Sequence, residues 1–377
     1  MKVSCIQENL AKGLGIVTRA VSARNVLPVL GNVLLATEES RLKLAATNLE
    51  MGITYWLGAK VESEGSITVP ARTILDFVNN LPNEKVHMTL DSRRQSLNLH
   101  CETFTSDIKG VDAQEFPLLP TASVGEGLAL NVADLREMIM QTMVAAATDD
   151  SRPVLTGVLL QLEGGKLTLA AADGFRLSVR HADLSATSKE AVSVIIPARA
   201  LGELARLIGD QDETVWMVLP SGRGQVVFRL KDAELSSSLI DGTFPDFQSI
   251  IPRSCSTRAV LSTAQFLKAC KAADIFARQA SHSARITITP GPASMPGRVQ
   301  VNATAAETGA GETVIDASVE GPEIEIAFNV KYLVDVLTVV NTPNVALEAT
   351  GSSAPGVIRP VGRDDFLHVI MPMHLGK

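Results

Sequence analysis

The side chains that most often carry out chemistry in proteins are spread thinly along this 377-residue sequence. The four cysteines form no CxxC pair and have no histidine at metal-ligand spacing, so neither a disulfide framework nor a zinc site is indicated. The six histidines are dispersed over the whole chain. Nucleotide-binding loops, nucleophile elbows and zinc-protease motifs do not occur. The sequence therefore favours a binding protein over an enzyme, with no metal and no cofactor.

Composition indicates an ordinary folded protein. The formal net charge of −7, from 34 basic and 41 acidic residues, excludes a tight, free-standing DNA binder. Aromatic residues make up only 4%, which argues against a base-stacking surface. Glu8 and Lys12 interrupt the apolar run that a signal peptide needs, and no stretch approaches the ~20 apolar residues that span a bilayer. We therefore expect a cytoplasmic protein with no membrane partner.

The elements that must position any binding residues are organised as an internal repeat. Two copies are clear from the pairs of matching blocks given at the end of this paragraph. A third copy, which contains FNVKYLVDVLTVV (328–340), is fainter and keeps the same pattern of a strand leading into a helix. Three copies of about 126 residues fill the chain, so we expect domains over 1–125, 126–256 and 257–377. The repeated pairs are PVLGNVLL (28–35) with PVLTGVLL (153–160), RLKLAATNLEMG (41–52) with KLTLAAADGFRLS (166–178), and VPARTILDFVNNL (69–81) with IPARALGELARLI (196–208), at offsets of 125, 125 and 127.

Each copy combines period-2 strands with two amphipathic helices. In the clearest helix Leu201, Leu204 and Ile208 share one face. Pro70 and Pro197 stand just ahead of their helices, where the missing N–H costs nothing. The predicted fold class is α+β, with helix pairs packed on antiparallel sheets. The six predicted helices cover residues 7–20, 71–81, 131–146, 198–209, 262–278 and 329–340.

The repeated blocks resemble the DNA polymerase III beta subunit family, the bacterial sliding clamps, over the whole chain. The resemblance implies three similar clamp domains and a head-to-tail homodimer closed into a ring around double-stranded DNA, with twelve helices lining the pore. It also implies a non-catalytic tether for the replicative DNA polymerase that an ATP-dependent clamp loader places on DNA. The blocks that carry it are LPVLGNVLL, TNLEMG, TVPAR, SRPVLTGVLL, ADGFRLS, IIPAR, DGTFPDF, FNVKYLVDVL and VIMPM.

Charge divides unevenly between the predicted helices and the rest of the chain. The helices carry ten basic and seven acidic residues, a balance of +3, which leaves −10 elsewhere. Solvated helix faces alone would also explain these charges. The family implies weak, sequence-independent phosphate contacts in the pore. The candidate DNA-binding residues are Arg24, Arg72, Arg136, Arg152, Arg199, Arg206, Lys268, Lys271 and Lys331.

The family further implies a groove between the second and third domains that binds short apolar motifs of partner proteins. Apolar walls with methionine adapt to varied partners, although HVIMPMHL could equally be a buried last strand. Phe175, Ala172 and Ser249 stand where the family often has His, Thr or Ser, and Arg, and they make the groove more apolar. The matching residues are Leu155, Gly174, Phe175, Arg176, Leu177, Pro245, Ile250, Asn329, Tyr332, Met371, Pro372 and Met373.

Subunit contacts are expected between the third domain of one subunit and the first domain of its partner. Ile275 lies on the charged face of its helix with Lys268 and Lys271, which suggests a contact. With Phe276 it would meet the partner near Phe104 or Ile108, as the family implies. Two other functions stay open at this point: a monomeric three-domain scaffold, and an enzyme whose site is assembled between repeats.

Overall fold

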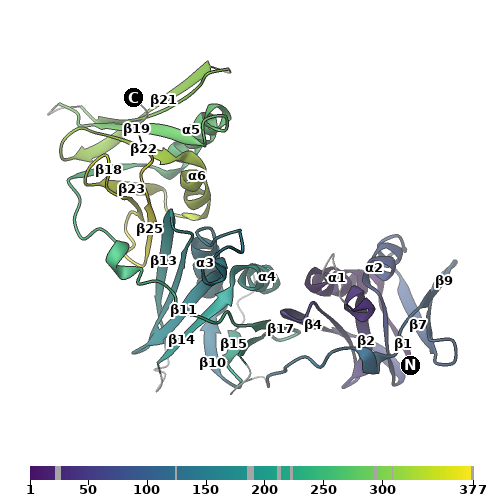
Figure 1. Ribbon diagram of the computed structural model, residues 1–377. Helices are drawn as coiled ribbons and strands as arrows, with labels where there is room; N and C mark the ends of the chain where they lie inside the picture. The colour runs from purple at the N-terminus through teal and green to yellow at the C-terminus, as the bar shows by residue number, and fades with distance from the viewer. Residues whose placement is uncertain are drawn as a thin grey trace. The chain divides into compact units, whose positions relative to one another are not determined.

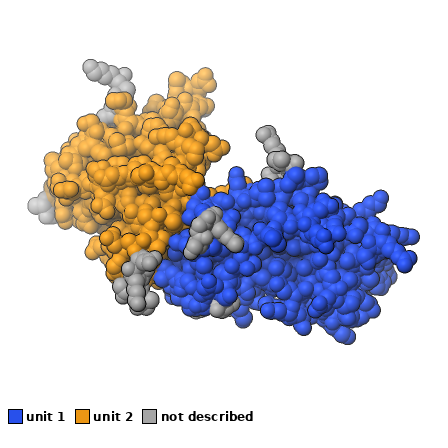
Figure 2. All heavy atoms as spheres, turned by 60° about the horizontal axis from the view of Figure 1, so that its bottom comes forward, with its two compact units in different colours: residues 1–133, 203–239 blue, residues 134–202, 240–377 orange. Residues whose placement is uncertain are grey.

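The computed structural model describes residues 1–21, 27–123, 125–184, 191–209, 214–220, 224–292, 295–307 and 309–374 (Figure 1). The chain forms two compact units (Figure 2). Unit 1 comprises residues 1–133 and 203–239, and unit 2 comprises residues 134–202 and 240–377. Both units therefore take a share of the central repeat copy.

All six predicted helices are present. Pro70 is the N-cap of the second helix, whose buried residues Ala71, Ile74 and Val78 follow the helical period. Ser262 caps the fifth helix, with its side chain accepting a hydrogen bond from the Gln265 N–H. The observed helices are α1 Gln7–Val17, α2 Ala71–Asn79, α3 Val132–Met143, α4 Ala198–Ile208, α5 Thr263–Ala277 and α6 Val330–Val339.

Unit 1 contains two antiparallel sheets. Their orders are β5-β1-β7-β8-β9 and β10-β15-β16-β17-β4-β3-β2-β6. Helices α1 and α2 pack on each other, and α1 also packs on β3 and β4, where Leu10, Leu14 and Val17 are buried. The strands are β1 Lys2–Ile6, β2 Asn32–Glu38, β3 Arg41–Thr47, β4 Met51–Gly58, β5 Lys60–Ser63, β6 Ser66–Pro70, β7 Lys85–Asp91, β8 Ser96–Cys101, β9 Phe104–Lys109, β10 Leu128–Asn131, β15 Thr214–Val218, β16 Gln225–Arg229 and β17 Ala233–Ser238.

Unit 2 is built on one long antiparallel sheet, in the order β14-β11-β12-β13-β25-β24-β23-β18-β21-β20-β19-β22. Helices α5 and α6 pack together over a core that includes Phe266, Phe328 and Phe366. The strands are β11 Gly157–Glu163, β12 Lys166–Ala172, β13 Arg176–Asp183, β14 Val192–Pro197, β18 Thr257–Ser262, β19 Ser283–Thr289, β20 Gly297–Ala305, β21 Gly309–Glu320, β22 Ile324–Asn329, β23 Asn344–Ala349, β24 Gly356–Pro360 and β25 Phe366–Ile370.

Strand pairing explains why the compact units cut through the central copy. In unit 1, β4 from the first copy pairs with β17 from the second, with Gly52 opposite Ser236. In unit 2, β13 from the second copy pairs with β25 from the third, with Leu177 opposite Val369. Because Gly52 and Leu177 are repeat-equivalent, the two junctions are formed in the same way. Each half of the central copy is thus hydrogen-bonded to a neighbouring copy.

Candidate functional site

The candidate DNA-binding side chains of the described chain are exposed. Of the eight candidates named at the end of this paragraph, Arg72 and Arg206 belong to unit 1 and the remaining six belong to unit 2. Arg152 donates a hydrogen bond to the Asp173 carbonyl at 2.9 Å, and Arg206 forms an ion pair with Glu203. Arg24 lies outside the described residues. The exposed candidates are Arg72, Arg136, Arg152, Arg199, Arg206, Lys268, Lys271 and Lys331.

The residues expected to bind partner peptides all lie in unit 2, where some form a buried floor and others an exposed rim. Leu155 and Leu177 are buried in one cluster with Phe244 and Phe247. Ala172, one of the departures from the family pattern, is buried in the same cluster. The exposed apolar rim consists of Phe175, Ile250 and Met371, which are 60%, 41% and 40% exposed.

The rim is held by a tight turn between β12 and β13. The Asp173 carboxylate accepts hydrogen bonds from the backbone N–H groups of Phe175 and Arg176 at 2.8 and 3.0 Å. Gly174 has φ +94°, and a Cβ there would lie 3.1 Å from the Arg152 guanidinium. Glycine therefore suits this position both by its conformation and by its lack of a side chain.

Arg176 connects this turn to α6. Its Nε lies 3.0 Å from Asp173 Oδ2 and its Nη1 lies 2.6 Å from Asp335 Oδ2. Its guanidinium lies 4.1 Å from the centre of the Tyr332 ring, a cation–π arrangement. Burial raises the pKa of the Tyr332 hydroxyl, and the nearby Asp173 carboxylate raises it further. The ion pairs and the ring contact thus fix Arg176 and Tyr332 in place beside the rim.

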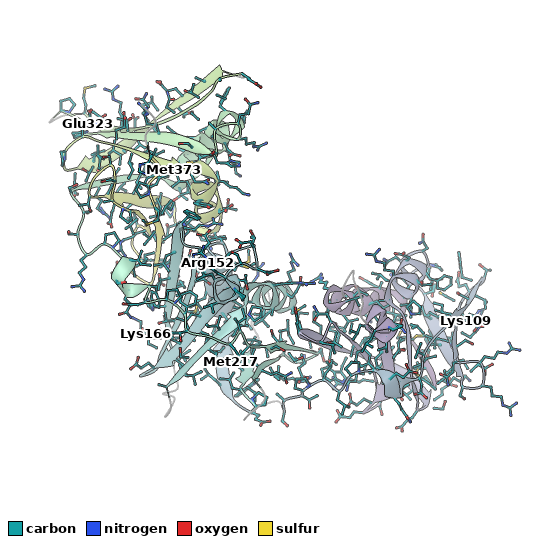
Figure 3. All side chains as sticks on the ribbon, in the orientation of Figure 1. Lys109, Arg152, Lys166, Met217, Glu323 and Met373 are labelled. Carbon is teal, nitrogen blue, oxygen red and sulfur yellow. The ribbon has the colours of Figure 1, made fainter. Side chains whose placement is uncertain are left out.

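The C-terminal segment completes this surface. The Met371 N–H donates to the Phe175 carbonyl at 2.8 Å, and the Met373 N–H donates to the Ala327 carbonyl of β22 at the same distance. Met373 is labelled in Figure 3. Asn329 caps α6 by accepting a hydrogen bond from Lys331 N–H. Pro245 is exposed next to buried Phe244, and Ser249 is exposed with its hydroxyl bonded to the Asp246 carbonyl. Of the block VIMPM (369–373), the first two residues therefore belong to β25, and the last three are accessible at the surface.

The residues expected at the subunit interface differ in exposure. Ile275 on α5 is 63% exposed, while Phe276 packs partly against the unit 2 core. On β9, Phe104 is 45% exposed but Ile108 is buried in its own sheet, so Ile108 supports β9 from the inside. Val314 on β21, which is not among the residues expected from the sequence, is half exposed and borders a cavity of about 450 Å³ together with Lys268. The alternating pattern of β21 was the available signal.

A cluster of ion pairs in unit 2 was not predicted. Glu137 on α3 accepts hydrogen bonds from Arg363 at 2.9 Å and from Arg180 at 3.1 Å. Arg180 is also paired with Asp365. Burial acts to raise the pKa of the Glu137 carboxyl, but hydrogen bonds from Arg363 and the charge of Arg180 outweigh it and lower that pKa. The cluster joins α3 to the segment that precedes β25.

Metal ions and membranes need recognisable groups of side chains or long apolar helices. Among the residues that the structure describes, no group of three or more His, Cys, Asp or Glu side chains is arranged to hold a metal ion. Within the same ranges, no helix combines the length and the apolar character needed to cross a membrane. The surfaces available for function are thus the basic helices, the rim around Phe175 and the edges near Phe104 and Ile275.

Comparison with known proteins covers the entire chain. Family models for the DNA polymerase III beta subunit match with its N-terminal domain at residues 1–120, its central domain at 129–246 and its C-terminal domain at 248–374. The beta sliding clamp of Synechocystis sp. is 33% identical over 100% of both chains, and that of Pseudomonas aeruginosa is 31% identical over 98% of both. A crystal structure of the Bacillus subtilis DNA polymerase sliding clamp superposes with a TM-score of 0.91 at 27% identity over 100% of both chains. The chain belongs to the DNA polymerase III beta subunit family, the beta sliding clamps, which are non-catalytic DNA sliding clamps.

Proposed function

We propose that two copies of this chain close head to tail into a ring that encircles double-stranded DNA and tethers the replicative polymerase to it. Membership of the sliding clamp family through all three domains is the observation that carries this proposal. A heterologous interface joins two different patches, and a ring results when the rotation between subunits closes. The chain offers two such patches, at β9 and at α5 with β21.

The two patches have matching properties. β9 is an edge strand of its sheet and presents Phe104, while residues 309–316 of β21 pair only with β20 among the described strands. Exposed sheet edges favour pairing with another strand, and Ile275 and Val314 add apolar side chains beside the β21 edge. Pairing β9 of one subunit with β21 of the other would cover both of these edges.

The DNA contacts we propose are made by Arg24, Arg72, Arg136, Arg152, Arg199, Arg206, Lys268, Lys271 and Lys331. The exposure of the eight described members supports contacts to phosphate groups, which carry no sequence information. The chain as a whole has a charge of −7, so its remaining surface repels DNA. Retention on DNA then depends on ring closure, and an ATP-dependent clamp loader opens the ring.

The surface around Phe175 is proposed to bind short apolar motifs of the polymerase, the loader and other partners. Its buried leucine floor and exposed Phe175, Ile250 and Met371 support this role, because an exposed apolar patch commonly marks a contact site. The domains that present these surfaces are proposed to span 1–125, 126–256 and 257–377. The limits of the three family matches, at residues 120 and 129 and at 246 and 248, support these boundaries.

Retention on circular DNA tests the proposal. After loading by a bacterial clamp loader with ATP, the protein should stay on closed circular DNA during gel filtration and leave it after a single restriction cut. Equal loss from circular and linear DNA would contradict a ring and favour a monomeric scaffold. Ile275→Asp should prevent dimer formation and retention, while Glu163→Ala, a change at an exposed residue of β11, should leave both unchanged.

A further inference from the structure

Three exposed leucines mark a second apolar surface, which lies in unit 1. Leu27, Leu49 and Leu118 are 47%, 54% and 100% exposed. Each lies within four residues in sequence of a member of a small buried cluster, which consists of Val29, Leu30, Ala45 and Phe116, with Leu34 and Leu119 packed against it. We refer to Leu27, Leu49 and Leu118 as the leucine patch. All three belong to the blue unit of Figure 2.

The internal repeat relates the leucine patch to the surface around Phe175. The offset of 125 residues places Leu49 at Gly174 and Leu27 at Arg152, and the offset of 128 residues places Leu118 at Asp246. The clusters beneath correspond as well, since Leu30, Ala45 and Phe116 match Leu155, Ala170 and Phe244 of the unit 2 cluster. Unit 1 therefore has the same kind of floor, but leucines stand where unit 2 has glycine, arginine and aspartate.

Leu49 is held in an unfavourable conformation. Its φ is +77°, in the left-handed region where its repeat partner is a glycine. The turn is fixed by Asn48, whose side-chain oxygen accepts hydrogen bonds from the N–H groups of Glu50 and Met51, and by Thr47, whose hydroxyl accepts one from Leu49 N–H. A leucine there gains little burial in return, and such residues gather at binding sites. Its side chain is thus placed for an external contact.

The shape of this surface differs from that in unit 2. A Cβ on Gly52 would lie 2.7 Å from Leu119 Cδ2, so the chain's own Leu119 fills the space above β4. Unit 2 has the larger Leu177 at the equivalent position. The leucine patch is therefore a shallow surface that suits the apolar face of a segment lying across it.

The charges around the patch indicate what that segment carries. Glu50 and Glu115 are exposed beside the leucines. The counterparts of Arg152 and Arg176 are Leu27 and Met51, so both arginines of the unit 2 surface are replaced by apolar residues, and Phe175 is replaced by Glu50. An acidic border favours a ligand with basic side chains and disfavours DNA phosphates.

We propose that the leucine patch is a second protein-docking surface, which binds a short amphipathic segment of a partner protein with an apolar face and flanking Lys or Arg residues. This surface is separate from the one around Phe175, so a single chain binds two partner segments at once. The proposal goes beyond the tethering function and does not depend on ring closure.

Peptide binding to the full-length protein tests this proposal without DNA. The probe is a fluorescent synthetic helix with leucines at i, i+3, i+4 and i+7 and lysines elsewhere, followed by fluorescence anisotropy. The paired variants Leu49→Ser/Leu118→Ser should weaken binding at least about tenfold, whereas Phe175→Ser/Met371→Ser should change it less than about twofold. A peptide with glutamate in place of lysine should bind at least about tenfold more weakly than the lysine peptide.

Three results would overturn the proposal. The first is equal binding of the lysine and glutamate peptides, and the second is unchanged affinity in the Leu49→Ser/Leu118→Ser protein. The third is self-association beyond the dimer that these two substitutions abolish, because the patch would then bind another copy of the chain. Leu49→Gly separates contact from folding, since glycine relieves the positive φ while removing the side chain. It should weaken peptide binding without lowering the thermal unfolding midpoint.

Discussion

The two sheet junctions, β4–β17 in unit 1 and β13–β25 in unit 2, use the same backbone pairing with different side chains. In unit 2 the buried Arg180 is held by Glu137 and Asp365. In unit 1 the neighbouring feature is Trp56, whose ring centre lies 4.1 Å from the Arg229 guanidinium and whose indole N–H donates to Glu38 at 2.8 Å. The unit 2 junction therefore has a buried arginine between two carboxylates, whereas the unit 1 junction has a buried arginine over a ring with one carboxylate, Glu234, at 3.9 Å.

The difference shows that the backbone pairing of the strands does not depend on which side-chain contacts stabilise the junction. The offset of 125 residues places Tyr55 at the position of Arg180, and His181 at the position of Trp56. The side chain that holds each junction therefore has no equivalent in the other junction. The ladder hydrogen bonds need only backbone and a compatible register. Buried charges cost desolvation energy that their partners must offset. Arg180 is offset by two carboxylates, whereas the buried Arg229 has the Trp56 ring and, 3.9 Å away, Glu234, whose raised pKa lets it bind a proton. The unit 2 junction should therefore be the more sensitive to loss of a single partner.

The largest effect is expected from Glu137→Ala. This substitution leaves Arg180 in a buried site without one of its two carboxylates, and removing one partner of a buried pair costs about 3–5 kcal/mol of unfolding free energy. Urea unfolding followed by circular dichroism measures the loss. Both tryptophans, Trp56 and Trp216, belong to unit 1, so their fluorescence reports on unit 1 alone. A decrease in unfolding free energy of less than about 1 kcal/mol would mean that the cluster of ion pairs does not stabilise the junction.

A smaller effect is expected from Ser178→Ala on β13. The Ser178 hydroxyl lies 2.6 Å from Nδ1 of the fully buried His368, whose Nε2 has no partner among the described residues. The single substitution leaves the imidazole without hydrogen bonds and should cost about 1–3 kcal/mol. Unit 1 has Ile53 opposite Leu235 at this place, so Ser178→Ala/His368→Leu should recover most of the loss. If the double variant is less stable than the single one, the comparison between the junctions fails here.

Arg229→Met should cost less, about 1 kcal/mol, in unit 1. The substitution removes the cation over Trp56 and leaves the buried Glu234 without its positive neighbour. Burial already raises the pKa of the Glu234 carboxyl, and the Ala122 N–H still donates to it at 3.0 Å. The carboxyl can therefore bind a proton instead of remaining a buried charge. Tryptophan fluorescence during urea unfolding gives the value, and a loss as large as that of Glu137→Ala would contradict the proposed difference.

Much of this organisation could be predicted from the sequence because it depends on local period and repetition. The helix containing Leu201, Leu204 and Ile208 and the exposed position of Ile275 are both confirmed. The roles of Ser178 and Arg180 could not be predicted, because both are polar residues on the strand face opposite Leu177 and Val179, and such a face is commonly solvated in antiparallel sheets. Both are buried, because residues distant in sequence, including Glu137 and His368, cover that face. Which residues of the peptide surface form floor or rim also depends on such distant packing.

The last prediction concerns pH, which should separate the junctions without substitution. Burial lowers the pKa of His368 to about 3, below the ordinary value of about 6.5 that it has in the unfolded chain. The unfolded chain therefore binds a proton first as pH falls, and unit 2 should lose stability from about pH 6.5 down to about pH 3. The Glu137 pKa, lowered in the folded protein, adds to this loss below the ordinary glutamate pKa.

Glu234 in unit 1 has the opposite sign. Because its pKa is raised in the folded protein, the folded state binds the proton first as pH falls. Protonation of Glu234 therefore stabilises unit 1 as pH falls through the folded pKa. Glu38 beside Trp56 partly cancels the gain, because burial acts to raise its pKa but hydrogen bonds from Trp56 and Lys43 lower it. Circular dichroism should therefore record an acid-induced loss before tryptophan fluorescence does. His368→Leu should reduce the interval between the two transitions, and coincident transitions in the unsubstituted protein would show that the junctions do not respond separately.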